Sequence, residues 1–129
     1  MPMIVFVAVG GALGAMARYG VGGWVHGWTS STFPWGTVVV NAAGSFLLGF
    51  SMRYLELVVA PPELRAGLTV GFLGAFTTFS TYSYETVALL QEGAWGRAAT
   101  YALGSLVIGV LFVLAGIAVA QLVSPVRGG

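Results

Sequence analysis

Four long apolar stretches alternate with three short polar breaks along this chain of 129 residues. The stretches cover about residues 3–25, 33–53, 64–90 and 97–123, and a helix needs roughly 20 mostly apolar residues to cross a bilayer. The breaks hold the TSST run after His26, the helix-stopping Pro61-Pro62 pair, and the short segment Gln91–Trp95. The pattern predicts an all-α membrane protein: a single domain, residues 1–129, of four transmembrane helices.

The composition supports a membrane protein and argues against several function classes. Hydrophobic residues make up 57% of the chain and charged residues only 7%, whereas soluble domains carry roughly a quarter charged residues. A net charge of +1 argues against a nucleic-acid partner. Without a carboxylate pair inside a span, and with the single His26 in a predicted loop, we expect no enzyme activity. No Lys or Arg precedes the first stretch, so we expect a span there rather than a signal peptide. The Gly10-xxx-Gly14 spacing in this stretch is typical of closely packed membrane helices and predicts that another helix approaches here.

The third stretch contains the unusual sequence GFLGAFTTFSTYSYE, from Gly71 to Glu85. Gly71 and Gly74 each lower helix propensity by ~1 kcal/mol, and the threonines that follow are poor helix formers. We therefore expect a break in the third helix around residues 74–78. Backbone carbonyls freed by a break cannot face lipid, so they must meet protein, water or an ion. One solution is a hard monovalent cation held by oxygen ligands.

Polar side chains recur at four-residue steps on two other stretches. Thr37, Asn41 and Ser45 share one face of the second stretch, while Tyr101 and Ser105 lead to Gly109 on the fourth. Such residues serve either as interhelical hydrogen bonds and small-residue packing, or as a polar track for an ion. Both interpretations stay open from spacing alone, although three polar groups in line on the second stretch favour a track.

Three further features allow both a structural and a functional interpretation. Arg18 lies inside the first stretch, where it either extends its guanidinium to the interface or attracts anions at a vestibule. Phe76, Phe79 and Tyr82 form an aromatic stripe that either packs in a core or offers positive ring edges to an anion. Glu85 is either an interface residue or part of a site.

The chain resembles the Fluc/CrcB family of fluoride channels over nearly its whole length. The resemblance is carried by GGALGAMARY, WGTVVVNAAGSFLLGF and GFLGAFTTFSTYSYE, which stand in the family's order and spacing. It implies a fluoride-selective channel that exports cytoplasmic fluoride passively and reduces its toxicity. It also implies a dual-topology homodimer of antiparallel subunits, multi-pass in the inner membrane of a prokaryotic cell, with two fluoride pores.

The resemblance also assigns roles to individual residues. It implies a structural Na⁺ at the dimer centre, held by the backbone carbonyls of Gly74 and Thr77. Arg18 would attract anions at the vestibule. The residues implied for the fluoride pore are Thr37, Asn41, Phe79, Tyr82, Tyr101 and Ser105, with Ser80, Thr81 and Glu85 as supporting residues.

Two positions depart from the family pattern, and two other functions compete with the channel. The family usually has Phe where this chain has Tyr82, whose hydroxyl adds a donor, and often has Ser where it has Gly109. A proton-coupled small multidrug transporter would need an acidic residue in the first stretch, which has Arg18 instead. A membrane scaffold that transports nothing would not need Asn41 together with the Thr- and Ser-rich break.

Overall fold

The computed structural model describes residues 2–29 and 32–125, and every regular element in these ranges is helical. The elements are α1 (Met3–Trp28), α2 (Trp35–Leu57), α3 (Pro62–Ala66), the π-helix η1 (Gly67–Leu73), α4 (Gly74–Phe76), α5 (Phe79–Gln91) and α6 (Trp95–Val123). Three of them, α1, α2 and α6, are long and apolar enough to cross a membrane. The count of four spans stays a prediction, because the third segment consists of shorter pieces.

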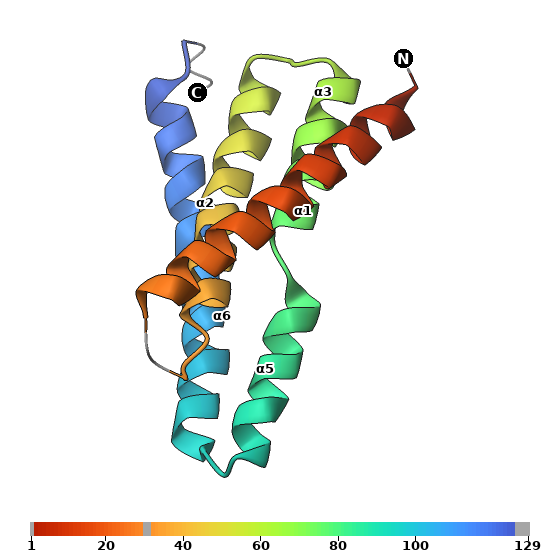
Figure 1. Cartoon of the computed structure of the whole chain (residues 1–129). Helices are drawn as coiled ribbons and strands as arrows, with labels where there is room; N and C mark the ends of the chain where they lie inside the picture. Colours follow the sequence, from red (N-terminus) through yellow and green to blue (C-terminus); the bar gives the residue numbers. More distant parts are fainter. Residues whose placement is uncertain (1, 30–31, 126–129) are drawn as a thin grey trace.

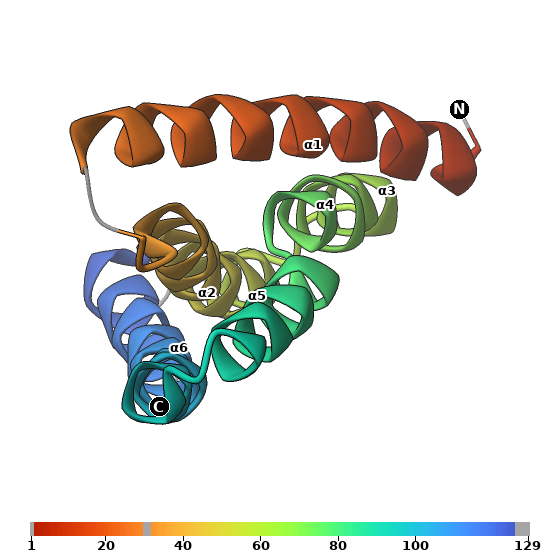
Figure 2. The same cartoon turned by 60° about the horizontal axis from the view of Figure 1, so that its bottom comes forward.

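The helices form two layers (Figures 1 and 2). α2 and α6 lie side by side and make the most extensive contact in the molecule. α1 crosses obliquely over α2, η1 and α4, and it leaves α5 and α6 uncovered. The segment α3–η1–α4 descends on one side of α2, and α5 continues from it toward the turn that leads into α6.

Glycines allow the helix backbones to approach one another closely. A Cβ atom on Gly10 or Gly14 of α1 would overlap a backbone carbonyl of η1. The same holds between α2 and α6, where a Cβ on Gly49 or Gly116 would overlap a backbone carbonyl of the other helix. The Gly10-xxx-Gly14 spacing therefore predicted a close helix contact correctly, as small residues do in membrane helices.

The third segment is interrupted near its middle. Pro62 lies in the first turn of α3, where a proline costs no hydrogen bond. α4 ends at Phe76, and the next two residues are extended, with φ/ψ of −83°/157° at Thr77 and −146°/115° at Thr78. α5 then begins at Phe79. The break falls at the end of the range that the glycines and threonines predicted, whereas no sequence pattern indicated the π-helix before it.

Two boundaries differ from the expectation by more than two residues. His26 lies in the last turn of α1, so placing it in a loop was wrong. α2 continues through Leu57, beyond the predicted end of the second stretch. In both cases the helix extends past the last apolar run, because a helix needs apolar residues only where it is surrounded by lipid or core.

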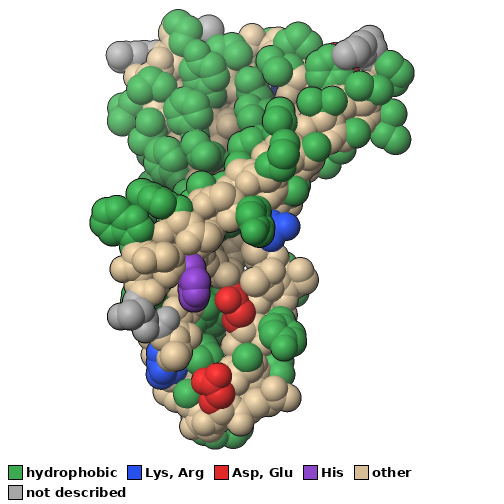
Figure 3. Space-filling model, in the orientation of Figure 1, with side chains coloured by type: hydrophobic (Ala, Val, Ile, Leu, Met, Phe, Trp, Pro, Cys, Tyr) green, Lys and Arg blue, Asp and Glu red, His purple; other side chains and the backbone are tan. Residues whose placement is uncertain are grey.

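On the face shown in Figure 3, charged side chains lie mostly in the lower part. Hydrophobic side chains cover the upper part of the face shown in Figure 3. Acidic and basic side chains and the histidine lie lower, and the histidine and one acidic side chain lie beside a hollow between α1 and α5. The break in the third segment leads directly into α5, which borders this hollow.

Candidate functional site

The break between α4 and α5 is held by side chains from two other helices. The amide of Asn41 on α2 donates from Nδ2 to the Thr78 carbonyl at 3.1 Å, and its Oδ1 accepts from the Thr78 N–H at 2.8 Å. Arg18 on α1 donates from Nε to the carbonyl of Ala75 at 3.1 Å. Asn41 therefore satisfies both backbone groups of the residue that leaves the helix, and Arg18 satisfies a carbonyl at the end of α4.

These contacts divert the amides that two carbonyls would bind in a continuous α-helix. The helical partner of the Gly74 carbonyl would be the Thr78 amide, which donates to Asn41 instead. The partner of the Thr77 carbonyl would be the Thr81 amide, which donates to the Thr78 hydroxyl at 3.2 Å. The two carbonyls predicted from the resemblance to bind a cation thus both lose their usual partner at the break.

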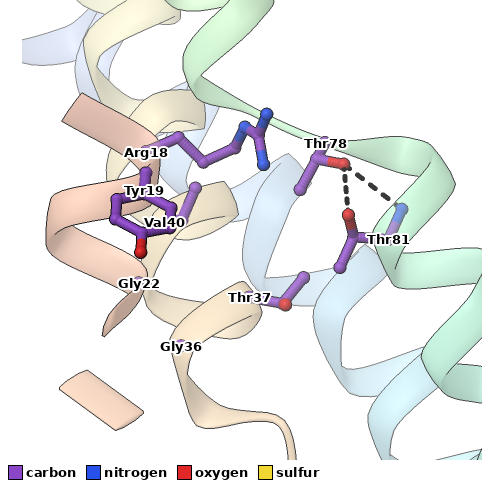
Figure 4. Close-up of a pocket in the computed structure, with 8 residues that line it drawn as sticks. All are labelled: Arg18, Tyr19, Gly22, Gly36, Thr37, Val40, Thr78 and Thr81. Carbon is purple, nitrogen blue, oxygen red and sulfur yellow. Dashed lines mark hydrogen bonds between the residues drawn. The ribbon is translucent and has the colours of Figure 1, made fainter. Parts of the chain in front are cut away.

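A cavity of about 170 Å³ lies between α1, α2 and the break (Figure 4). Arg18 extends into it from α1, toward Thr78. Hydroxyls from two sides line it, those of Thr37 on α2 and of Thr78 and Thr81 at the start of α5. The remaining lining residues are Tyr19, Gly22, Gly36 and Val40. The Thr37 and Thr78 hydroxyls donate to Glu85 and Thr81, so the guanidinium and the Thr81 hydroxyl are the groups that can donate to a small anion here.

Next to the cavity, one carboxylate oxygen accepts two hydroxyl hydrogen bonds. Oε1 of Glu85 on α5 accepts from the Thr37 hydroxyl at 2.6 Å and from the Tyr101 hydroxyl at 3.0 Å. Tyr101 on α6 is 1% exposed. The three residues come from α2, α5 and α6, so the bonds join three helices. The two hydroxyls already place their protons toward one anionic oxygen.

The aromatic stripe is divided by the break. Phe76 is 5% exposed and stacks on Phe72 within the segment before the break. Phe79 is 79% exposed and begins α5, with its ring centroid 5.9 Å from that of Tyr82. Phe76 is therefore a core residue, and the expectation of one continuous stripe was wrong. The extended backbone at residues 77–78 turns Phe79 away from the core.

Tyr82 lies against α6. Its hydroxyl donates to the backbone carbonyl of Ala102 at 2.6 Å, and its ring centroid lies 5.4 Å from that of Tyr101. The added hydroxyl of this chain is thus bound to protein and not directed into the cavity.

The remaining predicted residues lie along α5 and α6. The Ser105 hydroxyl on α6 is buried and has no hydrogen-bond partner among the described residues. Ser80 is exposed in the first turn of α5. A Cβ atom on Gly109 would lie 3.6 Å from the Ser45 hydroxyl, so α2 places a hydroxyl beside the position that lacks one.

The sequence did not identify Thr78 as part of the site. Its hydroxyl accepts from the Thr81 amide and donates to the Thr81 hydroxyl at 3.0 Å, so Thr78 caps the start of α5. Threonine is a favoured N-cap residue, and Thr78 directly precedes the restarted helix. The sequence therefore contained a signal for Thr78. It contained none for Ala75, because only the backbone carbonyl of Ala75 binds Arg18.

The comparison with known proteins defines the family. The model of the family described as CrcB-like protein, Camphor Resistance (CrcB), matches residues 5–117. The chain belongs to the CrcB family. Relatives of this chain include a protein of Thermus thermophilus, 53% identical over 85% of this chain and 87% of its own length. A Geobacter metallireducens protein is 49% identical over 84% and 88%, and a Hahella chejuensis protein 46% identical over 95% and 98%.

All three relatives carry the name fluoride-specific ion channel FluC. Together with the three helices of membrane-spanning length, membership of the CrcB family makes this chain an integral, multi-pass membrane protein.

Proposed function

We propose that this protein is a fluoride-selective ion channel that exports cytoplasmic fluoride passively. The name shared by the relatives supports fluoride as the conducted ion. The broken helix lies beside a cavity lined by a guanidinium and hydroxyl groups, which supports this cavity as part of the ion path. The observation that carries the proposal is the pair of hydroxyls, from Thr37 and Tyr101, that converge on one anionic oxygen. Fluoride is also a compact anionic acceptor, so the same donors suit it.

The path begins at Arg18 and continues along hydroxyl groups. Arg18 attracts the anion into the cavity, where Thr37 and Thr81 replace part of its hydration shell. Tyr101 and Ser105 continue the hydroxyl groups along α6: the unpartnered Ser105 hydroxyl has a proton to offer, and the Tyr101 and Thr37 hydroxyls serve the ion when they exchange Glu85 for it. Asn41 uses one N–H of its amide on Thr78 and keeps the second for the ion. Several weak donors in sequence allow conduction, because no single site binds too tightly.

The ring edges of Phe79 and Tyr82 form the second part of the proposed path. Aromatic edges carry a positive partial charge, so they attract an anion without the strong binding of a formal charge. Phe79 is 79% exposed on this single subunit. An exposed ring at the break suits a path completed by a second copy, so we propose the dual-topology, antiparallel homodimer as the working assembly, with Ser80 and Glu85 as supporting residues.

The driving force is the membrane potential. Fluoride enters cells as neutral HF, dissociates near neutral pH and is trapped as an anion. A negative interior then favours its exit by ~2.3 kcal/mol per charge for every 100 mV. Passive export needs no coupled energy source, and we place the protein in the inner membrane of a prokaryotic cell.

We further propose a structural Na⁺ at the dimer interface, bound by the carbonyls of Gly74 and Thr77. Among the described residues, no three acidic or histidine side chains gather into a metal site, so a cation at the break relies on backbone oxygens. The two carbonyl oxygens fit this role. The amides that they would bind in a helix donate elsewhere, which leaves the oxygens for a cation, and Gly74 is exposed. Two subunits would supply four oxygens, which suits a hard monovalent cation.

Removal of Na⁺ tests the cation site. Exchange of Na⁺ for a large organic cation during purification is expected to lower the melting temperature of the dimer and its dimer fraction in detergent. The reason is that anything bound only to the assembled state stabilises it by mass action. Thermal unfolding and light scattering measure the two effects, and return of Na⁺ should restore both. An unchanged melting temperature and dimer fraction after complete removal would refute the site.

Fluoride efflux tests the function itself. Liposomes that contain the purified protein and potassium fluoride are diluted into fluoride-free buffer, and valinomycin then provides a path for K⁺. A fluoride electrode is expected to record rapid efflux from these liposomes and only a slow leak from protein-free ones. Equal rates in the two preparations would exclude the proposed function.

A further inference from the structure

The Asn41 contacts and the Thr78 cap hold the start of α5 at the break, whereas little holds its first turn against α6. α5 and α6 meet at the turn formed by residues 92–94 and diverge from there toward the break (Figure 1). At the diverging end, Phe79 and Ser80 are exposed, and Thr81 lines the cavity. Tyr82 is therefore the first large side chain of α5 that packs against α6.

Two side-chain hydrogen bonds join α5 to α6. The one nearer the turn runs from the Tyr101 hydroxyl to Glu85. The one nearer the break runs from the Tyr82 hydroxyl to the carbonyl of Ala102, and at 2.6 Å it is short for a neutral bond. A carbonyl oxygen has two lone pairs, so Ala102 can accept this proton and keep its bond within α6.

The ring of Tyr82 is fixed at both ends. Its body packs against a buried cluster that includes Leu89, Ala98 and Tyr101, and its hydroxyl is bound to Ala102. The ring is half-buried and the hydroxyl proton is bound to Ala102, so the ring edge keeps one orientation. The ring centroids of Tyr82 and Phe79 are 5.9 Å apart.

We propose that the Tyr82 hydroxyl is a positioning group: it holds the first turn of α5 against α6, and so places Phe79 and the break, without serving as an ion ligand. The inference rests on the proposed channel function. It assigns a task to Tyr82, one of the two positions that depart from the family pattern. A phenylalanine at this position keeps the ring edge and loses the bond to Ala102.

The matched pair Tyr82→Phe and Tyr84→Phe tests the proposal. Tyr84 lies on the same helix, is 75% exposed and makes no hydrogen bond with the part of the chain that the structure describes. Both variants lose one hydroxyl and nothing else, so each is expected to fold. In Tyr82→Phe alone, the segment of residues 77–83 is expected to exchange its amide hydrogens faster, because its first turn loses its bond to α6.

The same variants are compared in fluoride efflux over a range of fluoride concentrations. An average interhelical hydrogen bond in a membrane corresponds to about a threefold change in an equilibrium. Tyr82→Phe is therefore expected to lower the maximal rate by about threefold, with unchanged half-saturation and unchanged discrimination against chloride. Tyr84→Phe is expected to match the wild type in all three.

Three results would overturn the proposal. A shift in half-saturation or in chloride discrimination would make the hydroxyl an ion ligand. A lower melting temperature with unchanged maximal rate would reduce it to a packing contact. Unchanged amide exchange in residues 77–83 would show that it does not hold the turn. Amide hydrogen exchange needs no ion flux. If the wild type passed no fluoride, the proposed function would fail, but amide exchange in the two variants would still decide the role of the Tyr82 bond to Ala102.

Discussion

Replacing Asn41 with alanine is expected to reduce fluoride efflux by at least about tenfold. The amide of Asn41 binds both the N–H and the carbonyl of Thr78, where the helix is broken. Alanine leaves both groups without a partner, at a cost of ~1–3 kcal/mol each when they stay buried. The break then shifts to another arrangement, and each ~1.4 kcal/mol of lost stabilisation along the path slows passage about tenfold. Efflux from liposomes measures the effect, normalised to the amount of dimer.

Thr100→Ala is the matched control for this prediction. Thr100 is an exposed polar residue of α6 that makes no hydrogen bond within the described parts of the chain. Its loss is expected to leave efflux within about twofold of the wild type, since changes at exposed positions have small effects. Wild-type efflux in Asn41→Ala would show that neither the bond to Thr78 nor the second N–H of Asn41 matters for the ion.

Replacing Phe79 with leucine is expected to abolish measurable fluoride efflux while the dimer stays intact. Phe79 is 79% exposed on the subunit, so its replacement leaves no cavity in the subunit core. Leucine keeps an apolar side chain of similar size but has no ring edge with a positive partial charge for the anion. Efflux, together with the dimer fraction in detergent, separates loss of conduction from loss of assembly.

Tyr84→Leu provides the control for loss of an exposed ring. Tyr84 is on the same helix and is 75% exposed, but it has no place in the proposed path. It is expected to conduct like the wild type. Efflux at the wild-type rate from Phe79→Leu would assign the Phe79 ring to packing, and the proposed path would then have to run elsewhere.

The sequence alone predicted the features that depend on local chemistry. Apolar runs placed the three long helices, and the Gly10-xxx-Gly14 spacing placed a close contact on α1. The poor helix formers after Gly71 placed the interruption, which the structure shows at Thr77 and Thr78. Each of these follows from the residues of one segment, because lipid solubility, close approach and helix propensity need no knowledge of a partner.

The contacts between helices could not be predicted in the same way. Spacing placed Thr37 and Asn41 on one face of α2, but it could not show that one binds Glu85 and the other binds the backbone of Thr78. Those pairings depend on how the helices cross. The Tyr82 hydroxyl bond depends on the angle between α5 and α6. The aromatic stripe is divided by the extended backbone at residues 77–78, whereas a periodic sequence pattern assumes a continuous helix.

The central claim is that this broken-helix site conducts fluoride and discriminates against other halides. The most direct measurement compares fluoride and chloride efflux from the same preparation of liposomes, each recorded with its own electrode. The account predicts fast, protein-dependent fluoride efflux and chloride efflux no faster than the leak of protein-free liposomes. Equal protein-dependent rates for the two anions would contradict it.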